Sequence, residues 1–100
     1  MEVRYEPSLL EYMEKKKTST ILVELVEINN SDLDVTELHV RLVNQRLRNI
    51  FVDQKRYRTV TTPHGEVLLP PFPLQLEDTI TFGLKKVLFA SMLTCKGIKV

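Results

Sequence analysis

The sequence lacks the features of a secreted or membrane-spanning protein. Cys95 is the only cysteine, so no disulfide bond can form within the chain, whereas small secreted domains usually depend on such bonds. Residues 1–7 contain no apolar stretch typical of a signal peptide. Segments free of charged residues, such as Val87–Cys95, are far shorter than the ~20 apolar residues of a membrane-spanning helix. We therefore expect a cytoplasmic protein with no membrane partner.

An excess of charge of either sign is also absent. The 14 basic and 13 acidic residues give a formal net charge of +1. So small a net charge provides no general attraction to nucleic acid or to an anionic membrane, and either partner would require a local basic patch. Hydrophobic residues make up 43% of the chain, which is ordinary for a globular protein. From its length of 100 residues, we expect a single domain over residues 1–100.

No sequence motif of a catalytic, metal-binding or nucleotide-binding site is present. A zinc site needs three or four converging ligands, and His39, His64 and Cys95 do not have the spacing of such a set. A nucleophilic cysteine needs a histidine beside it and a lowered pKa, so a plain thiol is the better interpretation of Cys95. Glu77-Asp78 is typical of a turn rather than of paired catalytic acids. We expect no enzymatic activity, no cofactor and no metal ion.

Two short amphipathic segments predict helices. Residues 7–17 begin with a proline, which suits the first helical turn, and carry apolar residues at spacings of three and four. Residues 85–93 can also place their apolar side chains on one stripe, which predicts one or two helical turns near the C-terminus. The apolar positions are Leu9, Leu10 and Met13 in the first segment, and Val87, Leu88, Met92 and Leu93 in the second. Gly97 is expected to cap the second segment.

Strand patterns dominate the region between these segments. Residues 18–28 are rich in β-branched side chains and largely apolar on both alternate faces, which predicts a central strand covered on both sides. Residues 35–43 alternate, with Leu38, Val40 and Leu42 on one face and polar side chains on the other, which predicts a half-buried antiparallel strand. The polar residues 29–32 supply a turn between the two, so we expect a β-hairpin.

The remaining segments are shorter and less regular. Proline gives no backbone N–H, so Pro70–Pro73 is expected to cross between sheets rather than to lie inside one. Leu74 and Leu76 are expected to point inward after it. The other predictions are a loop at Gln45–Asn49, strands at Ile50–Val52, Tyr57–Thr62, Thr79–Leu84 and Ile98–Val100, and turns at Pro63–Gly65 and Glu77–Asp78.

Short strands separated by polar turns are typical of a β-sandwich. Residues 26–36 resemble the strand–turn–strand of immunoglobulin-like and fibronectin-like modules, and residues 74–82 resemble the turn before a late core strand in them. The chain departs from antibody-type domains because it lacks paired cysteines and a tryptophan. The resemblance implies binding or scaffolding and brings no catalytic residues. We therefore expect a mainly β protein, an immunoglobulin-like antiparallel β-sandwich with a short N-terminal helix and a short helical segment near the C-terminus.

The predicted core and the predicted binding surface involve different side chains. The core is expected to enclose Val26, Ile28, Leu38, Val40, Ile80 and Phe82 between the two sheets. The most suggestive surface is the basic region Arg41–Arg58, in which Phe51 and Tyr57 are interleaved with cations. The alternative, without a binding function, is that these cations are solvated side chains on loops and strand edges. The residues chosen as candidates for partner binding are Arg46, Arg48, Arg56, Tyr57 and Arg58.

Two functions remain open from the sequence. The first is a non-enzymatic interaction or structural module that binds a protein partner, or a second copy of itself as a homo-oligomer, through a sheet edge or the terminal helices. The alternative is a nucleic-acid-binding module that uses the basic Arg41–Arg58 region. The near-neutral net charge favours the first.

Overall fold

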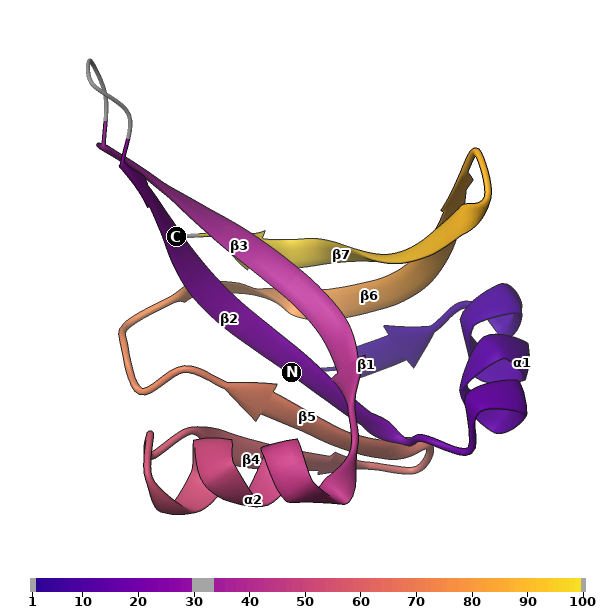
Figure 1. Ribbon diagram of the computed structural model, residues 1–100, viewed down its shortest axis with the longest axis horizontal. Coiled ribbons are helices and arrows are strands. Elements are labelled where there is room, and N and C mark those ends of the chain that lie inside the picture. The colour runs from indigo at the N-terminus through magenta and orange to yellow at the C-terminus, as the bar shows by residue number, and fades with distance from the viewer. Residues whose placement is uncertain (1, 30–33, 100) are drawn as a thin grey trace.

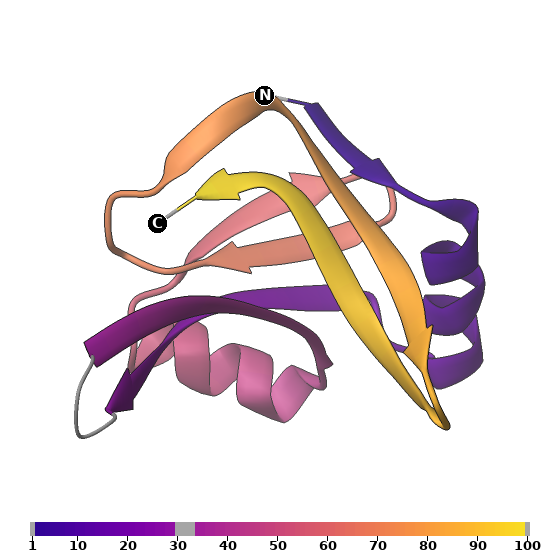
Figure 2. The same cartoon turned by 90° about the horizontal axis from the view of Figure 1, so that it is seen from above.

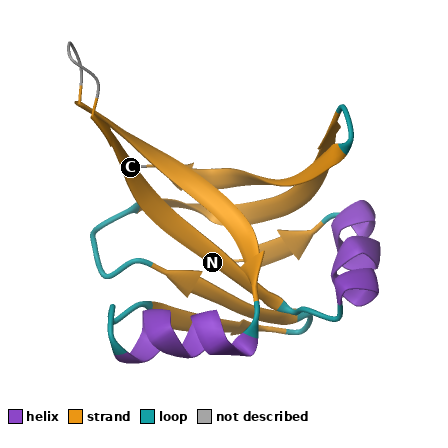
Figure 3. Cartoon of the chain, in the orientation of Figure 1, coloured by secondary structure: helices purple, strands orange, loops and turns teal. Residues whose placement is uncertain are grey.

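The strands of the chain form two sheets, one of three strands and one of four (Figure 1). The strand order is β1-β6-β7 in the first sheet and β3-β2-β5-β4 in the second. The elements in chain order are β1 (Glu2–Tyr5), α1 (Pro7–Lys16), β2 (Thr20–Asn29), β3 (Asp34–Val43), α2 (Gln45–Asp53), β4 (Arg58–Thr62), β5 (Gly65–Leu69), β6 (Gln75–Val87) and β7 (Ala90–Lys99). Strands dominate and the two helices lie outside them (Figure 3), so the expected mainly β architecture is confirmed.

This computed structural model describes residues 2–29 and 34–99, and all their side chains except those of residues 28, 29 and 34–36. The turn predicted at residues 29–32 extends beyond the described residues. The burial predicted for Ile28 also lies outside the described side chains.

The long hairpin of β2 and β3 follows the sequence pattern closely. The two strands pair antiparallel from Thr20–Val43 to Asn29–Asp34, and β2 is an inner strand of its sheet. Ile21 and Val23 are buried in the main core, whereas Leu22 is buried on the opposite face, under α2. Each face of β2 therefore has its own apolar cover, which explains why both alternate faces of this strand are apolar.

The expectation of wholly antiparallel sheets is wrong. β1 pairs parallel with β6, and β2 pairs parallel with β5. Strands β1 and β5, four and five residues long, were also missed. Thr20 pairs with Glu66, and the Glu66 N–H donates to the Ser19 carbonyl at 3.0 Å. A side chain at Gly65 would overlap that same carbonyl, so only glycine lets the two strands approach there.

The segment predicted as a loop at 45–49 and a strand at 50–52 is instead the helix α2. The Asn44 side chain accepts a hydrogen bond from the Leu47 N–H at 2.9 Å, which is an N-cap. Leu47 and Phe51, four residues apart, face the four-stranded sheet and pack against Leu22 there. A polar N-cap followed by this apolar spacing is the sequence signal that was missed.

The helix predicted at residues 85–93 is also wrong, because β6 and β7 continue through this segment as a hairpin. Their pairing extends to Val87–Ala90, and Leu88 adopts a positive φ of 56° in the turn. Gly97 does not cap a helix but lies in an irregular part of the β6–β7 pairing, opposite the stretch between Leu76 and Thr81. Glu77-Asp78 belongs to that same irregular stretch of β6 and forms no separate turn.

The main core lies between the two sheets and is covered at one end by α1 (Figure 2). Leu9 of α1 and Phe82 of β6 are fully buried in it, and Ile80 is almost so. Leu38 and Val40 pack against this cluster with partly buried side chains. Val26 is half-buried and outside the described cluster, and Leu76, expected to point inward, is exposed. Residues 70–73 connect β5 of one sheet to β6 of the other, as their prolines predict.

Candidate functional site

The basic region predicted from the sequence is divided by ion pairs. Arg48, on α2, donates two hydrogen bonds of 3.2 Å from its guanidinium to the two carboxylate oxygens of Glu66 on β5. Arg41, on β3, donates to Glu24 on β2 at 3.1 Å. These two arginines therefore connect neighbouring elements of the four-stranded sheet, and their charges are largely compensated.

Of the two aromatic residues of this region, Phe51 is buried and Tyr57 is half-buried. Phe51 is only 4% exposed, and the ring of Tyr57 packs edge-on against it at a centroid distance of 4.9 Å. The ammonium group of Lys55 lies 4.5 Å from the Phe51 ring centroid. Burial, and secondly the negative charge of Glu24, raise the pKa of the Tyr57 hydroxyl. The expectation of aromatic side chains exposed between the cations is therefore wrong for Phe51.

Three of the predicted binding residues remain available to an external partner. Arg46 lies on α2, Arg56 in the connection to β4, and Arg58 at the start of β4. All three are exposed, and none forms an ion pair with a carboxylate of the described residues. The structure thus leaves three free guanidinium groups where the sequence predicted a larger basic and aromatic surface.

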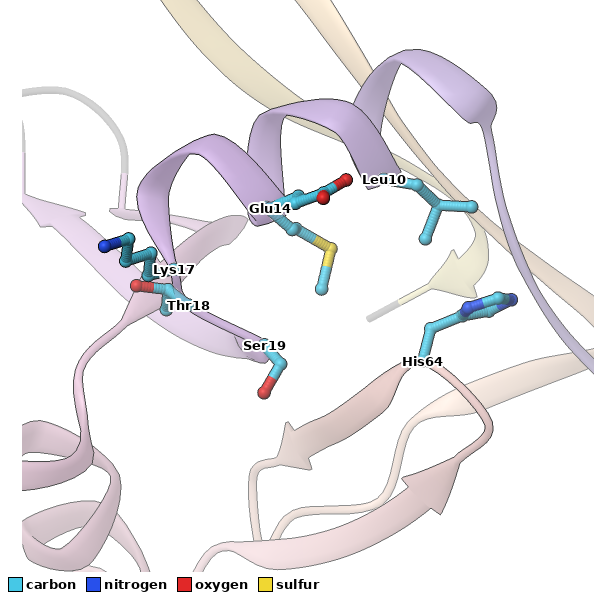
Figure 4. A pocket seen from close by; sticks show the side chains of 7 residues that line it. Leu10, Glu14, Lys17, Thr18, Ser19 and His64 are labelled. Atoms are coloured by element: carbon cyan, nitrogen blue, oxygen red, sulfur yellow. The ribbon is translucent and has the colours of Figure 1, made fainter.

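A groove of about 480 Å³ opens between the end of α1 and the turn that joins β4 to β5 (Figure 4). Leu10 and Met13 contribute apolar walls, whereas Glu14, Ser19 and His64 contribute polar groups. Figure 4 shows Ser19 and His64 on opposite sides of the opening, and no hydrogen bond among the described residues links Glu14, Ser19 and His64. The groove therefore contains no hydrogen-bonded nucleophile and base.

The side chain of His64, in the wall of this groove, packs against an aromatic ring of the other sheet. The His64 ring lies edge-on to the Tyr5 ring, with 5.2 Å between centroids. The Tyr5 hydroxyl is hydrogen-bonded to the Thr62 hydroxyl at 3.0 Å, and burial raises the pKa of Tyr5 despite that bond. These contacts join β1 of one sheet to the β4–β5 turn of the other, so they help to hold the two sheets together.

On the other side of the core, the sheets meet without hydrogen bonds. β3 and β7 are edge strands, and their Cα atoms approach within 8 Å, yet no ladder joins them within residues 2–29 and 34–99. A cavity of about 330 Å³ lies at this junction. We call this junction the β3–β7 seam, lined by Tyr12, Val40, Arg41, Leu42, Ser91, Met92 and Leu93.

The turn of the β6–β7 hairpin is the most exposed apolar part of the described chain. Leu88 is 92% exposed and Phe89 is 106% exposed, and Val87 and Met92 beside them are also exposed. Val87, Leu88 and Met92 were expected on one stripe of a helix, which the structure does not form. The signal that could have identified a hairpin is the strict alternation of Phe82, Leu84 and the residues that pair with them.

The remaining candidates for chemistry are unreactive in this structure. Burial raises the pKa of the Cys95 thiol to about 11, so the thiol is protonated at neutral pH. Among the described residues, no group of three or more His, Cys, Asp or Glu side chains is arranged to hold a metal ion. Neither helix of the described chain is long and apolar enough to cross a membrane.

Comparisons with known proteins leave the site without an assignment from relatives. No protein family matches this chain. No curated protein and no solved structure matches it either.

Proposed function

We propose that this chain is a non-enzymatic interaction module that associates with a second copy of itself through the β3–β7 seam. The observation that supports this proposal is that two edge strands meet there without pairing. Along the parts of β3 and β7 that do not approach each other, the outer side of each edge presents unpaired N–H and C=O groups, to which a strand of a second copy can add by hydrogen bonding. Val40, Leu42 and Leu93 give the seam an apolar lining that would support such an addition.

The charges of the two edges favour a second copy as the partner. Residues 34–43 of β3 contain two acidic residues and one arginine, whereas residues 90–99 of β7 contain two lysines and no acidic residue. The β3 edge of one copy and the β7 edge of another therefore carry opposite net charges. Opposite charges speed encounter and fix the register of an interface.

The experiment is sedimentation velocity over a wide range of protein concentration. We expect the mean mass of the wild-type protein to rise with concentration. The substitution Lys96→Glu reverses a charge of the β7 edge and should weaken this association, while Arg46→Glu, the same change on α2, should not. A mass that stays that of one chain at every concentration would refute self-association, and equal effects of the two substitutions would refute the seam as its site.

A second candidate function is the binding of single-stranded nucleic acid by Arg46, Arg56 and Arg58. Its support is that these three guanidinium groups are exposed and unpaired among the described residues. Because Phe51 is buried, phosphate contacts rather than stacking would provide the affinity. Three such contacts give a slope of log K against log salt of about −2. Retention on an oligonucleotide column that disappears when all three are changed to alanine would favour this function over the first.

The finer assignment to immunoglobulin-like modules stays a prediction. Its support is the pattern of residues 74–82, which in the structure covers the bulged start of β6. The two parallel strand pairs are a point of difference from a wholly antiparallel sandwich.

A further inference from the structure

The end of the β6–β7 hairpin combines exposed apolar side chains with cations. We call residues 85–92 the hairpin tip. Leu88 and Phe89, consecutive in its turn, are almost completely exposed, and Met92 is 57% exposed on the returning strand. Single exposed apolar side chains are normal on a protein surface, but a contiguous group of this kind marks a contact surface. Figure 1 shows the end of this hairpin projecting above α1 and away from the four-stranded sheet.

Lysines flank the hairpin tip, and acidic residues are missing from both of its strands near the turn. From residue 79 to residue 99 the sequence contains four lysines and no acidic residue. Lys85 pairs with Met92 and Lys86 with Ser91, and because neighbouring strand residues point to opposite faces, these lysines flank the tip on both faces. Lys86 and Lys15 of α1 line a shared surface pocket. The lining of this pocket includes one carboxylate, that of Glu11.

We propose that the hairpin tip inserts into the headgroup region of an anionic lipid surface. The two lysines lie two to four residues from Leu88 and Phe89, which in a strand is about 7 to 14 Å. Apolar side chains of interfacial proteins enter the boundary of headgroups and acyl chains by about 5–10 Å. With Leu88 and Phe89 at that depth, Lys85 and Lys86 lie at the level of the lipid phosphates. A projecting apolar turn with lysines on both of its faces is better suited to a lipid surface than to a flat protein surface.

This inference goes beyond the proposed self-association and uses a different surface. The seam is formed by the edges of β3 and β7, whereas the insertion is made by the turn between β6 and β7. The chain's near-neutral net charge does not oppose it, because the attraction is local to the tip and acts within about one Debye length of the lipid.

The chain offers a spectroscopic test, because it contains no tryptophan. The substitution Phe89→Trp places one reporter at the tip, and Phe72→Trp places a matched reporter at another exposed aromatic position, between β5 and β6. The probes are vesicles of phosphatidylcholine alone and vesicles that also contain phosphatidylserine. We expect the emission of the Phe89→Trp protein to shift to the blue with the anionic vesicles, and the emission of the Phe72→Trp protein to stay unchanged.

Co-sedimentation with the same vesicles measures the energetic contributions. Replacing both Leu88 and Phe89 by serine should lower the partition coefficient at least about tenfold, since two exposed apolar side chains are lost. Replacing Lys85 and Lys86 by glutamine should lower it about fivefold each, roughly 25-fold together. The control Lys55→Gln removes the same charge from the connection between α2 and β4, which Figures 1 and 2 show on the side of the molecule opposite the hairpin tip, and should have little effect.

Three results would overturn the inference. The first is absence of binding to anionic vesicles by the wild-type protein. The second is an equal blue shift for the Phe72→Trp and Phe89→Trp proteins, which would mean unspecific adsorption. The third is a serine variant of the tip that loses self-association in sedimentation velocity but binds anionic vesicles as strongly as the wild-type protein, which would assign the tip to a protein surface. Circular dichroism of each variant shows whether it is folded.

Discussion

Gly97 should be among the least replaceable residues of this chain. It adopts a φ of +98°, a backbone conformation that side chains of L-residues rarely adopt. A Cβ atom there would overlap the carbonyl oxygen of Thr79 and lie 3.2 Å from the Cα atom of Ile80. Both neighbours are backbone atoms, so no side-chain rotation can relieve the overlap. The substitution Gly97→Ala must therefore displace β6 or β7 where they bulge.

The expected cost combines two effects. The unfavourable backbone conformation costs about 1–2 kcal/mol for alanine, and the overlap adds about 1–3 kcal/mol. We expect Gly97→Ala to lower the free energy of unfolding by about 2–5 kcal/mol, and the midpoint of thermal unfolding by roughly 10–40 °C in a chain of this size. Urea denaturation followed by circular dichroism measures it.

The control is Lys96→Ala, an exposed neighbouring position that should change stability by less than about 0.5 kcal/mol. The displacement should also reach β1, because Ile80 pairs with Val3. If Gly97→Ala costs no more than Lys96→Ala, the close approach of residues 79 and 97 is not a property of the folded protein.

Three further predictions concern the core, the thiol and an ion pair. Leu9→Ala should lower the free energy of unfolding by about 2–5 kcal/mol, since Leu9 is fully buried, and a loss below 1 kcal/mol in urea would contradict the docking of α1. Cys95, with its pKa raised to about 11, should be alkylated at pH 8 about a hundredfold more slowly than a thiol of pKa 9.0, with a rate that rises tenfold per pH unit up to about pH 10. A rate that levels off near pH 9 would exclude that pKa. A double-mutant cycle of Arg48→Ala and Glu66→Gln should give a coupling of about 1 kcal/mol or less that decreases with salt, because both side chains are partly exposed.

Local patterns that repeat along a strand or helix were the most predictable parts of the fold. The helix that begins at Pro7 and the hairpin of β2 and β3 follow from proline chemistry and from strand alternation, respectively. Leu38, Val40 and Leu42 pack toward the core as their spacing predicts. These elements depend mainly on contacts near in sequence or on the direction of alternate side chains.

The wrong predictions arose in short segments whose apolar residues fit both the helical period of about 3.6 residues and the strand period of two residues. Residues 85–93 place apolar side chains at spacings of three and four, yet the backbone pairing of β6 with β7 continues through them. Residues 45–53 look polar and basic, yet Phe51 turns toward Leu22 and the sheet covers it. A short segment gains more from the tertiary contacts available to it than from its intrinsic preference, so propensity cannot decide it.

The candidate surfaces were predictable only in part. The arginines near α2 were visible in the sequence, but their pairing was not, because Arg48 and Glu66 are 18 residues apart and meet only through the parallel pairing of β2 and β5. The exposure of Leu88 and Phe89 in a turn was not predictable either, because the expected helix at residues 85–93 has no turn at these positions.

The alternation of side chains along a strand is encoded residue by residue, so the mainly β character, the inner position of β2 and the apolar face of β3 could be predicted from the sequence. The parallel pairing of strands, the ion pairing of Arg48 and the solvent exposure of the apolar turn at residues 88–89 became visible only in the folded structure. These features depend on which segments distant in the sequence become neighbours. The free energy that favours one such arrangement over others is the sum of many weak contacts, which no single segment encodes.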